Sequence, residues 1–262
     1  MKNSPYLLLM FALFGLSSCE KVITLDLKGE SKRVVIEGGV SNLAGPYTVR
    51  VSQSADFYQA SIGEVIPNAT VTLSDDAGTS ETLTYAGNGN YQTKSTRGIV
   101  GRTYTLRVSA NGGTYQATST MPLVVPLDAL TYEEQAVGDI IYANYIDPAP
   151  AGNCYRWVMY VNDKKQGDVF AANDRLNNGI RTRQALFLTD SNAPDLTTSD
   201  RIRVDMQSID APVYAYFFGL AQVLGSGNNQ AATPANPTSN LSGGALGYFS
   251  AYSMTTYNLT IK

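Results

Sequence analysis

The sequence of 262 residues contains no histidine, and this absence excludes more chemistry than any other feature of its composition. Without histidine the chain cannot form a Ser-His-Asp triad, a Cys-His pair or a histidine-ligated zinc or iron site. Charged residues are also scarce, at 16% of the chain, and the formal net charge at pH 7 is −3. Nucleic-acid binding requires an excess of Lys and Arg, so we expect no nucleic-acid partner.

Cysteine is nearly absent as well, and the first of the two cysteines, Cys19, directly follows an apolar run over 6–16. That run suits the h-region of a signal peptide and is too short to span a bilayer. The tetrapeptide Leu-Ser-Ser-Cys that ends at Cys19 resembles a bacterial lipobox, in which cleavage before the cysteine precedes attachment of lipid to its thiol. An ordinary cleaved signal peptide or a transmembrane helix is the alternative. The first lacks its usual A-x-A-like site here, and Glu20 and Lys21 end the apolar run too early for the second. We therefore expect a signal peptide over 1–18 and a membrane anchor on Cys19.

The second cysteine, Cys154, has no partner for an intrachain disulfide if Cys19 carries lipid, and no second thiolate with which to hold zinc. It lies in the apolar segment 153–161, which is typical of a buried strand. No helix start or cationic cluster nearby lowers the pKa of its thiol. We expect an inert core cysteine rather than a reactive one.

The first half of the chain is a series of short strand-like segments, following a tether over 19–30. They recur about every ten residues and are separated by turns rich in Gly and Asn. This spacing predicts an immunoglobulin-like β-sandwich over 31–122. The expected strands are 33–40, 46–51, 69–73, 79–85, 91–96, 103–108 and 115–120.

The second half continues as strands and defines a second antiparallel β domain over 127–262. Pro122 and Pro126 predict a stiff, extended connector between the domains, with a hinge at this point. The fold class expected for the whole chain is therefore all-β, with one short helix in the second domain. Its expected strands are 130–135, 140–145, 155–161, 168–171, 184–188, 201–208 and 254–261.

The expected helix covers 212–224. Asp210 is placed as its N-cap, Pro212 suits the first turn, and Gly225 is a typical stop. One face of this helix is apolar and is expected to pack on the second sheet. That face consists of Val213, Tyr216, Phe217, Leu220 and Leu224.

A long uncharged segment, 226–240, follows the helix and leads into a stretch rich in glycine and aromatic residues. Loops of this length are often functional. We take the loop 230–247 with the aromatics after it as the candidate contact surface for a partner or ligand. These aromatics either fill the edge of the domain, which the pattern favours, or form interface hot spots if they are exposed. The candidate contact residues are Asn236, Pro237, Asn240, Tyr248, Phe249 and Tyr252.

Acidic residues offer two weaker hypotheses. An Asp/Asn cluster over 168–178 is dense enough to hold calcium, but its spacing fits no EF-hand loop and a plain turn is favoured. The doublets 75–76 and 133–134 do not form a glycosidase pair by themselves, because adjacent strand residues point to opposite faces. We expect no enzyme activity, no cofactor and no resident metal. The cluster consists of Asp168, Asn173, Asp174, Asn177 and Asn178.

Several short strings are distributed along nearly the whole chain, at 18–23, 34–38, 155–157, 161–162, 204–210, 234–240 and 244–249. The most specific is Pro-Ala-Asn-Pro-Thr-Ser-Asn with the Gly-Ala-Leu-Gly-Tyr-Phe that follows it. Together these strings resemble one family, the Bacteroidota outer-membrane lipoproteins of the DUF4249 type, a domain of unknown function.

The resemblance implies an N-terminal Ig-like domain, a C-terminal β domain and an outer-membrane location, and it implies no established activity. It also implies an accessory role, since members of this family are often encoded beside TonB-dependent receptors. We therefore expect a non-catalytic scaffold for an outer-membrane partner that belongs to a TonB-dependent transport system. The alternative is a lipoprotein that captures a peptide or glycan for uptake.

Overall fold

The computed structural model describes residues 32–55, 63–135, 138–188, 195–225 and 236–262. The predicted signal peptide 1–18, Cys19 and the tether 19–30 lie outside the described residues, as does the part of the predicted contact loop over 230–235. Across the described part of the chain, no helix combines the length and the apolar character needed to cross a bilayer.

The described residues form strands throughout and one helix, as the sequence predicts. The helix is α2 (Ala211–Gly225). The strands of the first half are β1 (Val34–Ser41), β2 (Thr48–Gln53), β3 (Thr70–Asp75), β4 (Ser80–Thr82), β5 (Thr84–Gly87), β6 (Asn90–Gln92), β7 (Thr103–Ala110) and β8 (Gly113–Thr120). Those of the second half are β9 (Leu127–Glu133), β10 (Ile140–Ile146), β11 (Cys154–Val161), β12 (Lys164–Lys165), β13 (Phe170–Asn173), β14 (Arg181–Phe187), β15 (Arg201–Ile209) and β16 (Leu246–Thr260).

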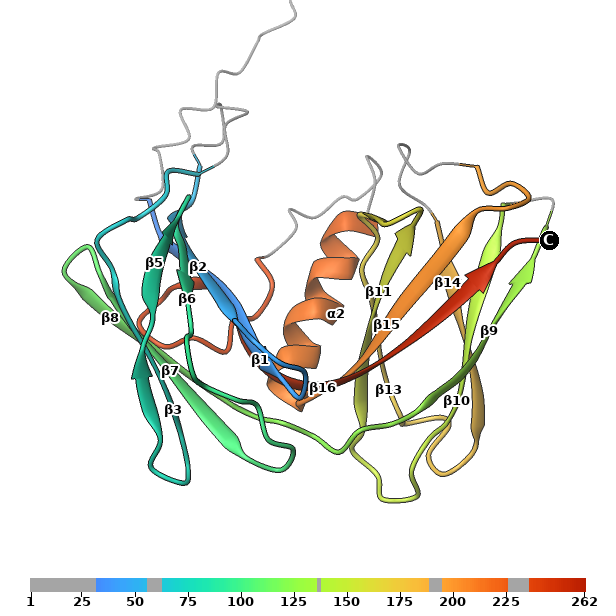
Figure 1. Ribbon diagram of the computed structural model, residues 1–262, viewed down its shortest axis with the longest axis horizontal. Helices are drawn as coiled ribbons and strands as arrows, with labels where there is room; N and C mark the ends of the chain where they lie inside the picture. Colours follow the sequence, from blue (N-terminus) through green and yellow to red (C-terminus); the bar gives the residue numbers. More distant parts are fainter. Residues whose placement is uncertain (1–31, 56–62, 136–137, 189–194, 226–235) are drawn as a thin grey trace, which may run out of the picture. The chain divides into compact units, whose positions relative to one another are not determined.

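These strands form three sheets, of which the largest has nine strands (Figure 1). Its order is β12-β11-β15-β16-β1-β2-β6-β5, and β13 pairs with β11 beside this path. The sheet β4-β3-β7-β8 packs against its N-terminal strands, and the sheet β14-β10-β9 packs against its C-terminal strands. Each half of the chain is therefore a two-layer sandwich, and the two sandwiches have one sheet in common.

Strand β16 is what makes the large sheet continuous. Its first part, 246–252, runs parallel to β1, with Ile36 opposite Gly247 and Ser41 opposite Tyr252. Its second part, 253–260, runs antiparallel to β15. The backbone hydrogen bonds of a single strand therefore join the two halves, and residues 32–262 form one compact unit.

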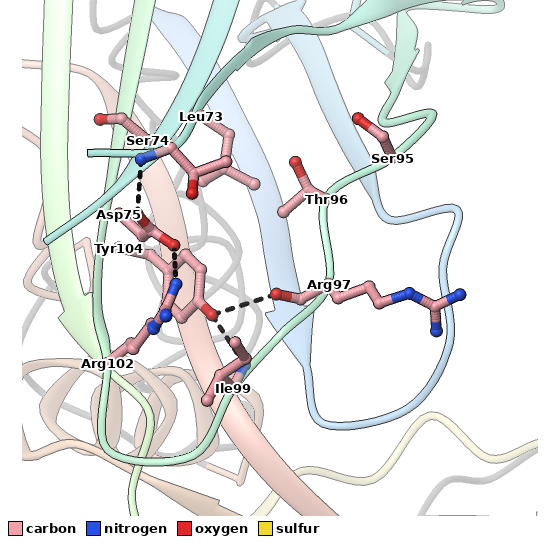
Figure 2. A pocket seen from close by; sticks show the side chains of 10 residues that line it. Leu73, Ser74, Asp75, Ser95, Thr96, Arg97, Ile99, Arg102 and Tyr104 are labelled. Carbon is pink, nitrogen blue, oxygen red and sulfur yellow. Dashed lines mark hydrogen bonds and ion pairs between the residues drawn. The ribbon is translucent and has the colours of Figure 1, made fainter. Parts of the chain in front are cut away.

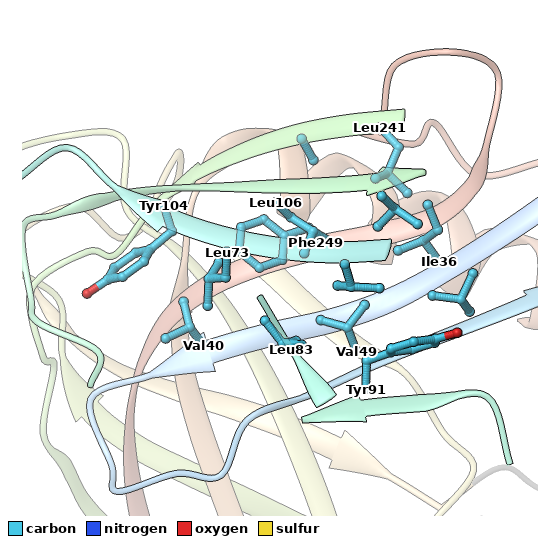
Figure 3. Packing of buried hydrophobic residues seen from close by; sticks show 14 of the residues in the cluster. Ile36, Val40, Val49, Leu73, Leu83, Tyr91, Tyr104, Leu106, Leu241 and Phe249 are labelled. Carbon is cyan, nitrogen blue, oxygen red and sulfur yellow. The ribbon is translucent and has the colours of Figure 1, made fainter. Parts of the chain in front are cut away.

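The core of the first sandwich includes side chains from the far end of the chain (Figure 3). Phe249 and Leu241 pack there among Ile36, Leu73 and Leu106. Phe249 is completely buried. The predicted domain division at 122–127 therefore needs a correction. Residues 241–252 were expected in the C-terminal domain, but they complete the N-terminal sandwich. The physical reason is that the apolar side of the first core between β1 and β8 would otherwise stay uncovered.

The connector between the halves is extended, as its prolines predict, but it is fixed along β16. The Ser253 hydroxyl donates to the Leu123 carbonyl at 3.0 Å, and the Thr255 hydroxyl donates to the Val125 carbonyl at 3.1 Å. Met121 is buried in the first core and Val125 in the second. The expected hinge is therefore replaced by a clamped segment with an anchor in each core.

The predicted strand 79–85 splits into two strands because the chain changes sheets there. β4 pairs with β3 in the four-stranded sheet, whereas β5 pairs with β6 in the nine-stranded sheet. Leu83 lies between them, buried, and its N–H donates to the Val71 carbonyl at 2.8 Å. One apolar residue at the crossing thus helps to hold both layers together.

Helix α2 starts at the predicted N-cap. One carboxylate oxygen of Asp210 accepts the Val213 N–H at 3.1 Å. The other accepts the Ser119 hydroxyl at 2.7 Å and the Thr120 N–H at 3.1 Å, both on β8. Asp210 therefore caps the helix and ties it to the first sandwich. Of the predicted apolar face, Val213, Tyr216 and Phe217 are buried and Leu220 partly so, but Leu224 is 60% exposed.

Replacing Asp210 by alanine is expected to destabilise the protein by about 2 kcal/mol, because the change removes a helix cap and two charge-assisted bonds to β8. For a chain of this size, that lowers the melting temperature by about 4–8 °C. The control is Asp128→Ala, which removes only an exposed ion pair to Arg181 at 3.6 Å and is expected to cost less than about 1 kcal/mol. Equal melting temperatures for the two variants would contradict the double role of Asp210.

Candidate functional site

A groove of about 440 Å³ lies on the face of the nine-stranded sheet opposite the two cores. Alternate residues of β16 produce it. Phe249 and Ala251 point into the first core, so Tyr248, Ser250 and Tyr252 point to the opposite face. The remaining walls come from β1, from the segment between β1 and β2, and from Arg156 on β11. The lining includes Glu37, Gly39, Leu43, Tyr47, Arg156, Tyr248, Ser250, Tyr252 and Met254.

Helix α2 packs against two residues of the groove wall, Tyr248 and Arg156, through an aromatic cluster. The Tyr248 ring lies 5.0 Å from that of Tyr216 and 4.7 Å from that of Phe217, measured between ring centroids. Burial raises the pKa of Tyr248, and the nearby positive charge of Arg156 acts in the opposite direction. Tyr248 is therefore both a packing residue under the helix and part of the groove wall.

The position of Tyr252 depends on a glycine in the neighbouring strand. A Cβ atom on Gly39 would lie 3.1 Å from the Tyr252 ring and 2.7 Å from the Ser250 carbonyl oxygen. Because glycine has no Cβ, the tyrosine ring can lie close against β1. Burial is also the main reason that the pKa of Tyr252 is raised.

The two charged side chains that line the groove, Glu37 and Arg156, form no ion pair with each other in the described part of the chain. The Arg156 guanidinium stacks 3.8 Å above the Phe217 ring, and its Nη1 donates to Gln207 at 3.2 Å. Glu37 lines the same groove, and within the described residues it forms no ion pair. Lys165 is exposed, but partial desolvation and the nearby charge of Arg156 lower the pKa of its ammonium, while Glu37 raises it.

The candidate contact residues from the sequence separate into two groups. Tyr248 and Tyr252 line the groove, and Asn236 is exposed at the end of the described segment. Phe249 is a core residue, so its assignment as a contact residue is wrong, and Asn240 has a structural role. The Asn240 side chain donates to the Phe249 carbonyl at 2.7 Å and accepts the Phe249 N–H at 3.0 Å, pairing with the free side of β16.

Pro237 is half-buried rather than presented to solvent, because it lies against α2. Its Cα is 3.5 Å from the position that a Cβ on Gly219 would occupy. Pro237 therefore helps to pack the loop on the helix. Sequence analysis missed Glu37 and Arg156. The only sequence signal for them was a charged residue at an alternate position in an otherwise apolar strand.

The Asp/Asn cluster extends from before β13 into the turn that follows it, and Asp174, Asn177 and Asn178 lie in that turn. One oxygen of the buried Asp174 accepts the N–H groups of Gly152 and Asn153 at 2.6 and 2.9 Å. Asn177 donates to Thr182 at 2.9 Å and to the Tyr145 hydroxyl at 3.3 Å. In the part of the chain that the structure describes, no three His, Cys, Asp or Glu side chains gather to hold a metal ion.

Cys154 is buried, as predicted, and packs with Ile209 and Val213 under α2. Burial raises the pKa of its thiol to about 11, and the nearby carboxylates of Asp174 and Asp210 add to this. A thiol with this pKa is almost entirely protonated at neutral pH and is a poor nucleophile.

A second hollow, of about 190 Å³, opens at one end of the first sandwich and is built for stability (Figure 2). Arg102 forms an ion pair with Asp75, with 2.5 Å between Nη1 and Oδ2. The Tyr104 hydroxyl accepts the Ile99 N–H at 2.7 Å. Figure 2 shows the Arg97 side chain pointing away from this hollow. The acidic doublets 75–76 and 133–134 also supply structural contacts of this kind. Asp76 accepts the Thr103 N–H, and Glu133 forms an ion pair with Arg183.

Glu81 holds the wall of this hollow and makes stability depend on pH. Burial raises its pKa, but the Thr96 hydroxyl and the N–H groups of 94–96 outweigh this and lower the pKa from 4.5 to about 2. A lowered folded-state pKa means that the stabilisation is present above about pH 4.5 and is lost as the pH falls toward 2. We therefore expect Glu81→Gln to be less stable than the wild type at pH 7, with the difference shrinking through this window. Unfolding midpoints at several pH values measure it, and a constant difference would contradict the assignment.

The family follows from a comparison with family models. A model described as "Domain of unknown function (DUF4249)" matches residues 20–258. The chain belongs to this family. The match includes β1, β11, α2 and most of β16, so the groove is formed by residues inside the DUF4249 region. No curated protein matches the chain.

Among solved structures, the chain is similar to a segment of two fibronectin type-III domains from chicken tenascin, at 11% identity and a TM-score of 0.23, covering 69% of this chain and 92% of that one. A cytokine receptor complex matches at 9% identity and a TM-score of 0.26, with coverages of 87% and 95%. The chicken interferon gamma receptor alpha chain matches at 10% identity and a TM-score of 0.22, with coverages of 68% and 88%.

Proposed function

We propose that this DUF4249 chain is a non-catalytic accessory lipoprotein, anchored in the outer membrane by lipid on Cys19. Its partner is an outer-membrane protein of a TonB-dependent transport system. The lipid confines the protein to the membrane plane and raises its effective concentration near such a partner. The groove beside Tyr248 and Tyr252 supplies the contact.

The observation that supports a scaffold most strongly is the shared strand β16. Binding proteins that capture a small ligand between two lobes commonly close by a hinge motion. Here β16 pairs with both β1 and β15, and the connector is bonded to β16 at Ser253 and Thr255. This arrangement holds the two sandwiches as one body, which suits a platform that keeps a contact surface at a fixed position.

The test is co-purification of the full chain. The protein carries a tag after Lys262, native outer membranes are solubilised gently, and the proteins that elute are identified and quantified. We expect a stoichiometric outer-membrane protein that remains bound in salt. Elution of the chain alone from wild-type membranes would contradict the proposal.

The second candidate is a lipoprotein that captures a peptide or glycan for uptake. The groove of about 440 Å³ with its tyrosines and two unlike charges favours it, because small-ligand sites combine apolar walls with a few placed polar groups. A panel of peptides and oligosaccharides tested by thermal shift separates the candidates, since a ligand that binds only the folded state raises the melting temperature. Stabilisation by one member, without a co-eluting protein, would favour this alternative.

A further inference from the structure

Three arginines of this chain use the same arrangement, a guanidinium stacked on an aromatic ring. Arg183 lies 3.5 Å over the Tyr142 ring, and Arg203 lies 3.8 Å over the Tyr160 ring. Both also have a carboxylate, since Arg183 pairs with Glu133 and Arg203 lies 3.8 Å from Asp205. Stacking leaves the edge of a guanidinium free for a carboxylate, and in these two cases the protein supplies one.

Arg156 is the exception. It lies 3.8 Å over the Phe217 ring and bonds to Gln207, but it forms no ion pair with a described carboxylate. The stack and the Gln207 bond fix the orientation of the guanidinium, which lowers the entropy cost of binding a ligand there. Arg156 is therefore a preorganised cation that forms no ion pair within the described residues, although the acidic residues Glu37 and Asp168 line the same hollows.

Groups of both charges lie around Arg156, since Glu37 lines the same groove. Arg156 lines both the groove and an adjoining hollow of about 320 Å³, where Lys165 and Asp168 are further lining residues. Lys165 is exposed, and the charge of Arg156 contributes to lowering the pKa of its ammonium. Two cations that disfavour each other are both stabilised when an anion binds between them.

We propose that Arg156, assisted by Lys165, binds a carboxylate of an acidic segment of a partner protein that lies in the groove. A carboxylate matches the planar fork of the guanidinium, with two parallel N–H···O bonds. Leu43 and Met254 line the same groove, and Leu43 is 48% exposed. These side chains suit an apolar neighbour of the acidic residue, which favours a protein segment over an acidic glycan. The inference rests on the proposed function, whose partner is a protein.

The first experiment measures fluorescence anisotropy of fluorescein-labelled hexaglutamate and hexaglutamine with the detergent-solubilised full chain at physiological salt. We expect tighter binding of hexaglutamate and a loss of about tenfold in its affinity in Arg156→Gln. Lys165→Ala, at an exposed position, is expected to lose about threefold. Arg183→Gln is the matched control, because it also removes a stacked guanidinium, and it should bind as the wild type does.

A substitution at Glu37 is expected to change the affinity for hexaglutamate in the opposite direction. Its carboxylate lines the groove and competes electrostatically with an incoming anion, so Glu37→Gln is expected to bind hexaglutamate more tightly than the wild type. Equal affinity for the two peptides, equal losses in Arg156→Gln and Arg183→Gln, or tighter binding of an oligogalacturonate than of hexaglutamate would each overturn the inference. If circular dichroism shows that Arg156→Gln does not fold, the other two variants test the inference. Weaker hexaglutamate binding by Lys165→Ala and tighter binding by Glu37→Gln would support it, and unchanged affinities in both would overturn it.

The second experiment separates this inference from the proposed function. The co-purification is repeated with Arg156→Gln and Arg183→Gln, and we expect the partner to be reduced only in Arg156→Gln. If both variants retain the full amount of partner, the inference fails and the scaffold stands. If the wild type itself recovers no partner, the proposed function fails.

Discussion

Replacing Gly247 by alanine is expected to destabilise both halves of the protein together. The backbone of Gly247 has a φ of +91°, and a Cβ atom there would lie 2.0 Å from the carbonyl oxygen of Ile36. A left-handed backbone costs a residue other than glycine about 1–3 kcal/mol. The clash adds to this, because the β1–β16 pairing must open to relieve it. We expect a loss of at least about 3 kcal/mol, and a melting temperature lower by about 6–12 °C.

Gly244 provides a matched control three residues earlier. It also has a positive φ, of +76°, but a Cβ atom there would meet nothing within 4 Å. Gly244→Ala therefore has only the backbone cost, about 1 kcal/mol. Thermal unfolding followed by circular dichroism compares the two variants. Equal melting temperatures would mean that close approach of β1 to β16 does not determine stability.

Replacing Cys19 by alanine is expected to abolish incorporation of radiolabelled palmitate and to remove the protein from the outer-membrane fraction. Under the proposed function the thiol of Cys19 is the attachment point for acyl chains, and each buried CH₂ group contributes about 0.8 kcal/mol to membrane binding. Two acyl chains make a stable anchor. Their loss should therefore change the location of the protein rather than slightly weaken its binding to the membrane.

The other cysteine is the control for this experiment. Cys154→Ala leaves the anchor intact and changes only a buried side chain, so it should keep both the label and the membrane fraction. Palmitate labelling that persists in Cys19→Ala, or an undiminished outer-membrane fraction of that variant, would contradict a lipid anchor at this position.

Local patterns in the sequence were sufficient for most of the individual elements. Spacing and the Gly- and Asn-rich turns predicted the strand 103–108 that became β7, and Asp210 with Gly225 predicted the limits of α2 to within one residue. These elements are determined by residues close together in the chain, through pleat, capping and backbone conformation.

The first part of β16 could not be predicted in this way. Residues 246–252 become a strand because they fill the gap beside β1, which is more than 200 positions away in the chain. Gly247 and the two glycines just before the segment, Gly243 and Gly244, also argue against a strand when the sequence is considered alone. Likewise the sequence left open whether Phe249 fills the edge of a domain or contacts a partner, because only the tertiary structure shows which core it enters.

The groove escaped prediction for a related reason. Arg156 is one arginine in an apolar strand, and its importance depends on Phe217 from α2, Gln207 from β15 and Lys165 from β12. No spacing along the sequence connects these positions. Tyr248 and Tyr252 were identified because their glycine-rich surroundings are unusual, and they mark the same groove.

The claim that supports the proposed scaffold is that β16 makes the two sandwiches one rigid unit. Differential scanning calorimetry of the detergent-solubilised full chain tests it most directly. We predict a single unfolding transition whose calorimetric enthalpy equals the van't Hoff enthalpy, and which stays single, at a lower temperature, in Gly247→Ala. Two transitions in the wild type, or a calorimetric enthalpy well above the van't Hoff value, would show that the halves unfold independently and would contradict the claim.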